Sequence, residues 1–514
     1  MERSRTQNSI NNIIFGAINR MISIIFPFIV RTIFIKTLGE EYLGLNSLFS
    51  SVLQVLNLAD LGFSSAIVAS MYKPIADNDV GKISALMNLY RKIYRIIGFS
   101  ILGVGIILTP FISLVINGEP PGGVNIYLLW LLYLANTVVS YLLFSYKISV
   151  LNAHQRNDIT EKIGAISRIL ISILQIYVVS VLNSIYLYVS LTILSSIIYN
   201  AWCAYECDKR YPQYSCKGEL DSITKKTISK NIGALTIQKI GNTVSLSLDA
   251  IIISAFLGLT TVAIYGNYFY VISAISIFIS MLYSAITASI GNSIATETPE
   301  KNYFDFKKIF FLNTWLIGWC CVCFMVIFQD FMTIWMGEDL LFGFGIVFSI
   351  VMRFFFEQVR KVVLTYKDAA GMWQKDKWRP LVGCIVNLIL NIALVKSVGV
   401  IGVMISTIFS YALIELPWET HTLFKHYFKR SVIEYYRAMI FCTVTMALAG
   451  GVTYLICSML PISGMLTIAV KLLICIVLPN LLFVLFNLKN TDFLNSLDIL
   501  KRVQNNMVKK LNKA

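Results

Sequence analysis

Twelve ionisable side chains stand out inside long apolar segments of this 514-residue chain, and the eight basic ones, Lys361 among them, outnumber the four acidic ones. A charge at the centre of a membrane-spanning helix costs about 2.5–3.5 kcal/mol on insertion scales, so each of these residues needs a partner or a function. Eight of them are the main candidates for function, four basic and four acidic: Arg20, Lys239, Arg353, Arg360, Asp60, Asp249, Glu357 and Glu415. Basic side chains facing a shared cavity would bind an anionic substrate. The acidic ones could couple transport to Na+ or H+, or pair with the cations.

Arg20 and Asp60 lie at similar depths on consecutive apolar segments, so they either neutralise each other or serve a substrate. An internal repeat with an offset of 219 residues places Lys239 at the position of Arg20, whereas Ile279 stands at the position of Asp60. Lys239 therefore lacks that partner and is the strongest candidate for contact with an anionic substrate. Asp249 follows Lys239 by ten residues, which is about 15 Å along a helix and beyond direct contact.

Arg353, Glu357 and Arg360 are spaced by four and three residues, which places them on one face of a helix. They either form a structural ladder or leave one positive charge for a substrate. Glu415 is a candidate for carrying a coupling proton or binding sodium. Three further basic residues near span ends are expected to extend toward the lipid headgroups, namely Arg31, Arg168 and Lys471.

The chain carries no catalytic constellation. It has no glycine-rich phosphate loop and no metal-ligand pair on a helix face. Neither the ten cysteines nor the three histidines have the spacing of a zinc site, and most of the cysteines fall in apolar runs. We therefore expect no enzyme activity, no metal and no resident cofactor, with Na+ or H+ as the candidate coupling ion.

The composition is that of a polytopic membrane protein. Hydrophobic residues make up 57% of the chain, charged residues only 14%, and the mean hydropathy is +0.71. These values exclude a soluble enzyme or a disordered chain, and the long apolar runs are unlike the alternating strands of a membrane barrel. The net charge of +15 is expected of a protein on anionic lipid, and we predict no nucleic-acid partner.

Fourteen stretches have the length and hydropathy of membrane-spanning helices. Their limits are 10–36, 42–72, 88–116, 124–147, 160–181, 184–206, 230–258, 261–294, 308–334, 340–366, 380–396, 399–424, 436–458 and 463–487. With a cytoplasmic N-terminus, 33 of the 43 Lys and Arg residues fall on the inside and only two, Lys36 and Lys396, on the outside. This asymmetry predicts that both termini are cytoplasmic.

The internal repeat predicts two lobes. Ser65–Ser70 (SAIVAS) matches Ser284–Ser289 (SAITAS), and Leu38-Gly39 matches Leu257-Gly258. Six spans separate the copies, so both copies have the same orientation in the membrane. We predict an all-α fold of two six-helix lobes around a central cavity, with two additional C-terminal helices. The predicted domains are an N-lobe at 1–207, a basic cytoplasmic linker at 208–229, a C-lobe at 230–424, helices thirteen and fourteen at 425–487, and an amphipathic basic tail at 488–514.

Several motifs resemble the polysaccharide transporter family. They are LGEEYLGLN at 38–46, LADLGFSSA at 58–66, Asn387 with Asn391, Gly399 with Gly402, and Ser406-Thr407. That family includes the Wzx-type flippases and belongs to the superfamily of multidrug and toxin extrusion antiporters and lipid II flippases. The likeness extends over the whole chain through its helix count, duplication and length.

The resemblance implies translocation of an undecaprenyl-pyrophosphate-linked oligosaccharide across the bacterial cytoplasmic membrane by alternating access. It also implies basic cavity residues on the first and seventh helices, which are the positions of Arg20 and Lys239. By analogy, we expect Arg353 and Arg360 to face the same cavity. Membrane lipids are the expected surroundings, and a polysaccharide polymerase of the same pathway is a candidate partner.

Three other functions remain open at this stage. A multidrug or cation antiporter would need an acidic cavity, whereas basic residues are in excess here. A membrane-embedded glycosyltransferase or polymerase would carry a long outside loop, which the predicted spans do not leave room for. Lipid II is an alternative cargo of the same chemical class as the lipid-linked oligosaccharide.

Overall fold

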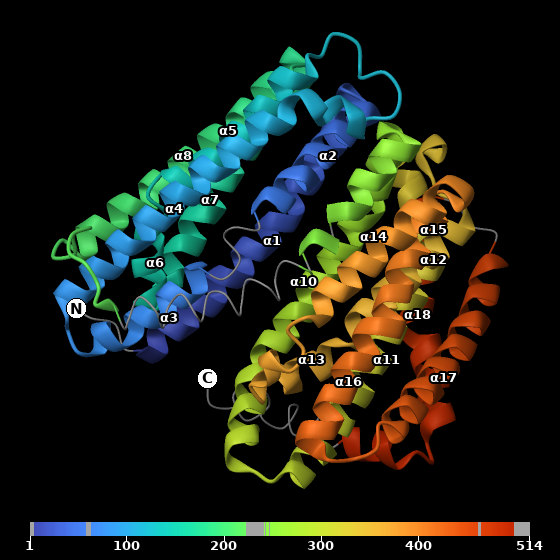
Figure 1. Cartoon of the computed structure of the whole chain (residues 1–514). Helices are drawn as coiled ribbons and strands as arrows, with labels where there is room; N and C mark the ends of the chain where they lie inside the picture. Colours follow the sequence, from blue (N-terminus) through green and yellow to red (C-terminus); the bar gives the residue numbers. More distant parts are fainter. Residues whose placement is uncertain are drawn as a thin grey trace. The chain divides into compact units, whose positions relative to one another are not determined.

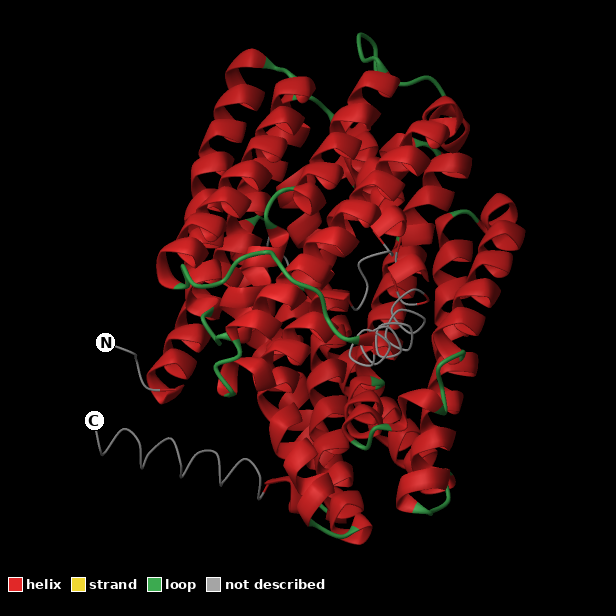
Figure 2. Cartoon of the chain, turned by 60° about the vertical axis from the view of Figure 1, so that its left-hand side comes forward, coloured by secondary structure: helices red, strands yellow, loops and turns green. Residues whose placement is uncertain are grey.

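The computed structural model describes residues 5–57, 63–222, 241, 243–245, 247–460 and 464–497 (Figure 1). Every regular element within those ranges is a helix, and loops of different lengths join the helices (Figure 2). The predicted all-α fold class is therefore confirmed for the described residues. Long helices are the expected outcome for an apolar chain, because a helix pairs its own backbone N–H and C=O groups without water.

The chain forms two compact units, Met1–Gly266 and Asn267–Ala514. The first unit contains α1 (Arg5–Thr37), α2 (Glu40–Leu56), α3 (Phe63–Ala76), α4 (Val80–Leu108), α5 (Ile126–Leu142), α6 (Ser145–Ala153), α7 (Asn157–Tyr177) and α8 (Ile185–Arg210). Helix α10 (Leu259–Thr296) begins in the first unit and continues into the second. The second unit then contains α11 (Pro299–Met336), α12 (Phe344–Val359), α13 (Lys361–Ala369), α14 (Arg379–Val398), α15 (Val400–Phe409), α16 (Leu416–Leu423), α17 (Ile433–Ser458) and α18 (Met465–Asn487).

Ten helical segments are long and apolar enough to cross a membrane, and the pair α5 and α6, bent by 49°, would make an eleventh. The chain is therefore a multi-pass membrane protein. Three of the fourteen predicted spans do not pass this test: 42–72 corresponds to α2 and α3, 230–258 falls partly outside the described residues, and 340–366 is divided between α12 and α13. The exact count of fourteen stays a prediction.

The internal repeat is visible in the local backbone. Gly39 precedes α2 with φ +98°, and Gly258, 219 residues later, precedes α10 with φ +90°. This region of φ favours glycine because a Cβ would clash there, so both copies begin the helix in the same way. The first copy forms two helices, α2 and α3, whereas the second forms the single helix α10.

The C-terminal helices pack on α11. Trp315 Nε1 donates a hydrogen bond to Asn480 Oδ1 over 2.9 Å, and Trp319 Nε1 donates to the Cys475 carbonyl over 2.7 Å. Lys471 Nζ lies 2.6 Å from Asp330 Oδ2. An acidic partner on α11 therefore pairs with the ammonium group of Lys471, and the extension of this side chain to the headgroups stays a prediction.

Gly44 on α2 lies against the backbone of Leu259 in the first turn of α10. A Cβ added at Gly44 would lie 2.2 Å from the Leu259 carbonyl oxygen, and that backbone atom has no rotamer by which to move away. Gly44→Ala should therefore lower stability by about 1–3 kcal/mol through overpacking. We expect a lower thermal midpoint for the purified protein in detergent.

The matched control for Gly44 is Gly103→Ala on α4. An added Cβ there would have no neighbour within 4 Å, and alanine favours a helix over glycine by about 0.8–1 kcal/mol. An equal loss of thermal stability in both variants would contradict the close approach of α2 to Leu259.

Candidate functional site

A polar stripe follows one side of α10, which is otherwise apolar. Ser276, Ser280, Tyr283 and Thr287 recur at intervals of four, three and four residues, the spacing of one helix face. Gln358 Nε2 donates a hydrogen bond to Ser276 Oγ over 3.2 Å. We call this contact between α10 and the α12–α13 segment the polar seam, and define it by the stripe, Gln358 and Lys361.

Lys361 lies at the start of α13, where the polar seam opens into a pocket of about 230 Å³. Its Nζ donates a hydrogen bond to Ser280 Oγ over 2.8 Å. The remaining lining residues add three hydroxyl groups, one carboxylate and one leucine: Tyr283, Thr287, Thr365, Asp368 and Leu364. Among the described residues, no carboxylate lies within ion-pair distance of Lys361. The pocket thus combines one ammonium group, four hydroxyl groups and one carboxylate, and its ammonium and hydroxyl groups are donors that can bind phosphate or sugar oxygens.

Two of the predicted site residues lie near the polar seam. The guanidinium of Arg353, which is 1% exposed, lies 4.2 Å from the centre of the Phe269 ring on α10. Glu357 accepts a hydrogen bond from Gln358 Nε2 over 3.3 Å. Arg353 and Glu357 therefore belong to the same side of the α12–α13 segment as Lys361, and all three lie within the second unit.

Arg360 belongs instead to a buried ion-pair network. Helix α12 ends at Val359 and α13 begins at Lys361, so Arg360 occupies the break between them. Its Nε lies 3.0 Å from Glu419 Oε2, and its Nη2 also pairs with Glu415. Arg360 was predicted to bind substrate, or else to pair in a ladder along its own helix. In the structure its acidic partners are Glu415 and Glu419, so the ladder is wrong for Arg360, and its contact with a substrate stays a prediction.

The network extends to α14 and to the segment that precedes it. Arg379 Nη1 lies 2.5 Å from Glu415 Oε2 and its Nε lies 3.1 Å from Asp376 Oδ2, while Lys367 pairs with Asp376 as well. The six side chains are all at most 6% exposed, and they comprise three cations and three anions: Arg360, Lys367, Arg379, Asp376, Glu415 and Glu419. The buried network is therefore neutral, which is how buried charges are tolerated.

A π-helical turn and a glycine position Glu415. The turn spans Ser410–Glu415, and Ser410 Oγ donates a hydrogen bond to the Gly383 carbonyl over 2.9 Å. A Cβ at Gly383 would lie 2.8 Å from Glu415 Oε1, so the glycine leaves room for this carboxylate. Of the roles predicted for Glu415, the structure shows charge pairing.

Four members of the network were missed in the sequence. Lys367, Asp376 and Arg379 lie in a polar stretch between two predicted spans, and Glu419 lies toward the end of another span. The spacing of four between Glu415 and Glu419 was the available signal, since it places two carboxylates on one helix face.

The first unit contains two other predicted site residues in its described part. Arg20 is exposed on α1, and no described carboxylate lies within ion-pair distance of its guanidinium. Asp249 is fully buried and accepts a hydrogen bond from the Tyr265 hydroxyl over 3.4 Å. Asp60 and Lys239 lie outside the described residues, so the Arg20–Asp60 pair and the role of Lys239 stay predictions.

The motif residues on α14 and α15 hold those two helices together. Asn387 Nδ2 donates to Thr407 Oγ1 over 2.9 Å, and Asn391 Nδ2 donates to Asn387 Oδ1 over 3.2 Å. All three side chains are buried. The bond from Asn387 to Thr407 joins α14 to α15, the helix that leads into the segment carrying Glu415.

Comparison with known proteins gives a family and a fold. The model of the family described as "Polysaccharide biosynthesis protein" matches residues 9–287. A search of the curated proteins found no match. A lipid II flippase MurJ in an inward closed conformation is 14% identical, with 93% of this chain and 99% of that chain covered and a TM-score of 0.65. An inward-facing multidrug resistance MATE family transporter of the MOP superfamily is 15% identical. The match covers 79% of this chain and 97% of that chain, with a TM-score of 0.60.

A MOP superfamily transporter from Pyrococcus furiosus has the same fold. It is 14% identical, with 82% of this chain and 96% of that chain covered and a TM-score of 0.56. At these identities the three likenesses establish a shared architecture, and the residue chemistry must carry any further argument.

Proposed function

The chain belongs to the polysaccharide biosynthesis protein family, and we propose that it is a flippase for lipid-linked oligosaccharides. Its cargo would be an undecaprenyl-pyrophosphate-linked repeat unit for capsule, O-antigen or exopolysaccharide assembly. The cargo would cross the bacterial cytoplasmic membrane by alternating access. The single observation that carries this proposal beyond the family is the unpaired Lys361 among hydroxyl groups in an apolar, membrane-spanning unit.

The chemistry of the cargo explains the need for such a pocket. A pyrophosphate with attached sugars is too polar to cross about 30 Å of hydrocarbon unaided. Lys361 offers an ammonium group for a phosphate oxygen, and the hydroxyls of Ser280, Thr287 and Thr365 can exchange hydrogen bonds with sugar or phosphate oxygens. The polyprenyl tail would stay in the lipid.

Outward movement of this cargo does not require ATP hydrolysis as its driving force. With an inside-negative potential, outward movement of an anion is favoured by about 2.3 kcal/mol per charge per 100 mV when the charge crosses the whole field. Coupling to Na+ or H+ would instead require an acidic residue that is free to titrate. Glu415 is already held by two guanidinium groups, which leaves Asp60, Asp249 and Glu357 as the candidates.

Lipid II translocation is the second candidate function. The MurJ structure covers 93% of this chain whereas the MATE transporter covers 79%, and both lipid II and the proposed cargo carry a pyrophosphate. A drug or cation antiporter is less well supported, because three buried carboxylates in the second unit, on Asp376, Glu415 and Glu419, are neutralised by basic partners.

Deletion of the gene in its native host should abolish surface polysaccharide and leave completed lipid-linked repeat units on the cytoplasmic face. Extracted lipid-linked sugars and surface polymer are the quantities to measure, with the wild-type gene restored as the control. Accumulation of peptidoglycan precursor instead would indicate lipid II as the cargo. Unchanged polymer together with new sensitivity to cationic dyes would contradict the flippase and favour the antiporter.

A further inference from the structure

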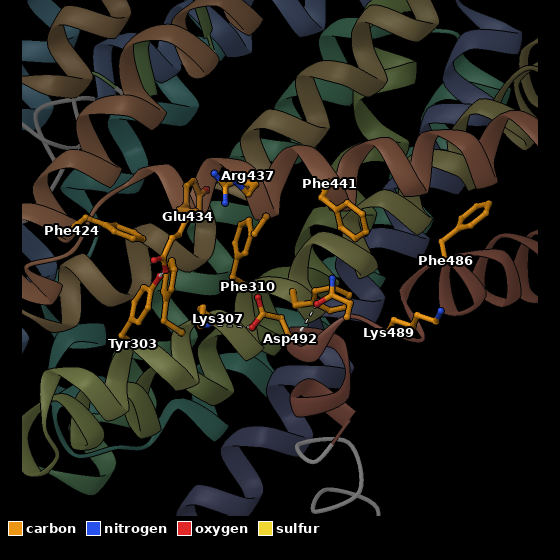
Figure 3. Close-up of a pocket in the computed structure, with 15 residues that line it drawn as sticks. Tyr303, Lys307, Phe310, Phe424, Glu434, Arg437, Phe441, Phe486, Lys489 and Asp492 are labelled. Carbon is orange, nitrogen blue, oxygen red and sulfur yellow. Dashed lines mark hydrogen bonds and ion pairs between the residues drawn. The ribbon is translucent and has the colours of Figure 1, made fainter.

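A second, larger pocket lies where α11 and α17 begin and α18 ends (Figure 3). Its volume is about 500 Å³, and all of its lining residues belong to the second unit. We propose that this pocket binds the phosphate headgroup of an anionic glycerophospholipid from the surrounding bilayer. This site is separate from the polar seam, and the proposal does not depend on the cargo.

The charged rim of the pocket carries three basic and two acidic side chains, so it has one positive charge in excess: Lys307, Arg437, Lys489, Glu434 and Asp492. Lys307 Nζ lies 3.3 Å from Asp492 Oδ1, and Glu434 accepts a hydrogen bond from the Tyr303 hydroxyl over 2.8 Å. Arg437 on α17 and Lys489 just after α18 are exposed, and neither has an ion-pair partner among the described residues. A guanidinium and an ammonium at the mouth of one pocket are suited to a phosphodiester.

The interior of the pocket is aromatic. Phe306 and Phe310 of α11 form part of its wall, and Phe441 and Phe486 complete it from α17 and α18. Phe441 is 44% exposed and Phe486 is 47% exposed, although both belong to membrane-spanning helices. These rings therefore offer a surface for the first carbons of acyl chains that enter from the lipid.

The pocket lies near one end of the spans, where headgroups are expected. Helix α11 contains 38 residues, so it is about 57 Å long, whereas the hydrocarbon core is about 30 Å thick. Its first turns carry Lys301, Asp305 and Lys307 and therefore project beyond the hydrocarbon. The N-terminal end of α17 adds a positive helix dipole at the same place.

Two other occupants fit the pocket less well. The C-terminal residues 498–514 carry five basic side chains and one acidic one, so Arg437 and Lys489 would repel them. A polyprenyl phosphate carries the same phosphate chemistry but only one chain, whereas the exposed rings of Phe441 and Phe486 stand on two different helices and can each contact one of two acyl chains. Basic pockets between membrane helices are an established type of anionic-lipid site.

The test compares lipids and variants on the delipidated, full-length protein in detergent. The shift of the thermal midpoint is titrated with dioleoyl phosphatidylglycerol, dioleoyl phosphatidylcholine and undecaprenyl phosphate. We expect saturable stabilisation by phosphatidylglycerol that weakens about tenfold in the R437Q/K489Q double variant, as loss of charge-assisted contacts predicts. Phe486→Ala should weaken the same binding without changing the charge.

The control variant K82Q/K217Q removes two exposed positive charges from the first unit. It should bind phosphatidylglycerol as the wild type does. Equal weakening in K82Q/K217Q would mean that general surface charge attracts the lipid, and would overturn the proposal. Stabilisation by undecaprenyl phosphate but not by phosphatidylglycerol would also overturn it, as would an unchanged affinity in both R437Q/K489Q and Phe486→Ala.

Discussion

Replacing Lys361 by methionine should reduce export of the lipid-linked oligosaccharide about 10- to 100-fold, since hydrogen bonds to charged groups contribute about 1.5–3 kcal/mol. Methionine keeps most of the length of the side chain and removes only the ammonium group. The hydrogen bond to Ser280 Oγ is lost with it, so the thermal midpoint should fall slightly. The measurement is surface polysaccharide in the deletion strain that carries the variant, at equal protein level in the membrane.

Two matched variants make this result specific. Lys375→Met removes an exposed charge of the same unit and should leave export unchanged. Lys361→Arg keeps a positive charge in the pocket and should retain part of the activity, although a planar guanidinium fits a compact ammonium site imperfectly. Normal export by Lys361→Met would remove Lys361 from the proposed mechanism, and equal impairment by Lys375→Met would indicate a general effect of charge.

The sequence predicted the long helices well because hydropathy and length determine whether a segment can cross a bilayer. The prediction of 184–206 corresponds to α8 (Ile185–Arg210), and that of 463–487 corresponds to α18 (Met465–Asn487). Breaks within helices were not predicted. The 49° bend between α5 and α6 falls inside the predicted span 124–147, since an average over about 20 residues does not register a local change of direction.

The candidate site was only partly predictable, because its pairings are tertiary. Charges inside apolar segments drew attention to Arg353, Glu357 and Glu415, but helix spacing suggested the wrong partner for Arg360. Its acidic partners lie 55 and 59 residues away in the sequence. No local pattern reports a contact at that separation.

Lys361 illustrates the opposite difficulty. The sequence marks it as one more basic residue in a span, without a reason to choose it over its neighbours. Its importance arises only when α10 brings the hydroxyl stripe of Ser276, Ser280 and Thr287 against the α12–α13 segment. The spacing of the stripe in the sequence predicts that its side chains share one face of a helix. It does not predict which other helix that face will contact.

Replacing Glu419 by leucine should be the most destabilising single change in the second unit. The network is neutral in the wild type. The substitution leaves three buried cations, Arg360, Lys367 and Arg379, with only two carboxylates, those of Glu415 and Asp376, so one positive charge is uncompensated. Breaking a buried pair in this way costs about 3–5 kcal/mol. We expect a strongly lowered thermal midpoint and little monodisperse protein on size exclusion in detergent.

The double variant Arg360→Met/Glu419→Leu separates charge balance from simple loss of contacts. It removes one cation and one anion, so Arg379 and Lys367 remain against Glu415 and Asp376, and much of the lost stability should return despite the second substitution. Glu297→Leu, which removes the acid of an exposed pair with Lys301, should cost less than about 1 kcal/mol. If the double variant were as unstable as Glu419→Leu, or less stable, the stability of the protein would depend on the geometry of each contact in the network and not on its charge balance. Recovery in the double variant would instead mean that the buried cations need the carboxylates chiefly as counter-charges. These cations would then be committed to the network, whereas Lys361 in the polar seam keeps its charge for an anionic cargo.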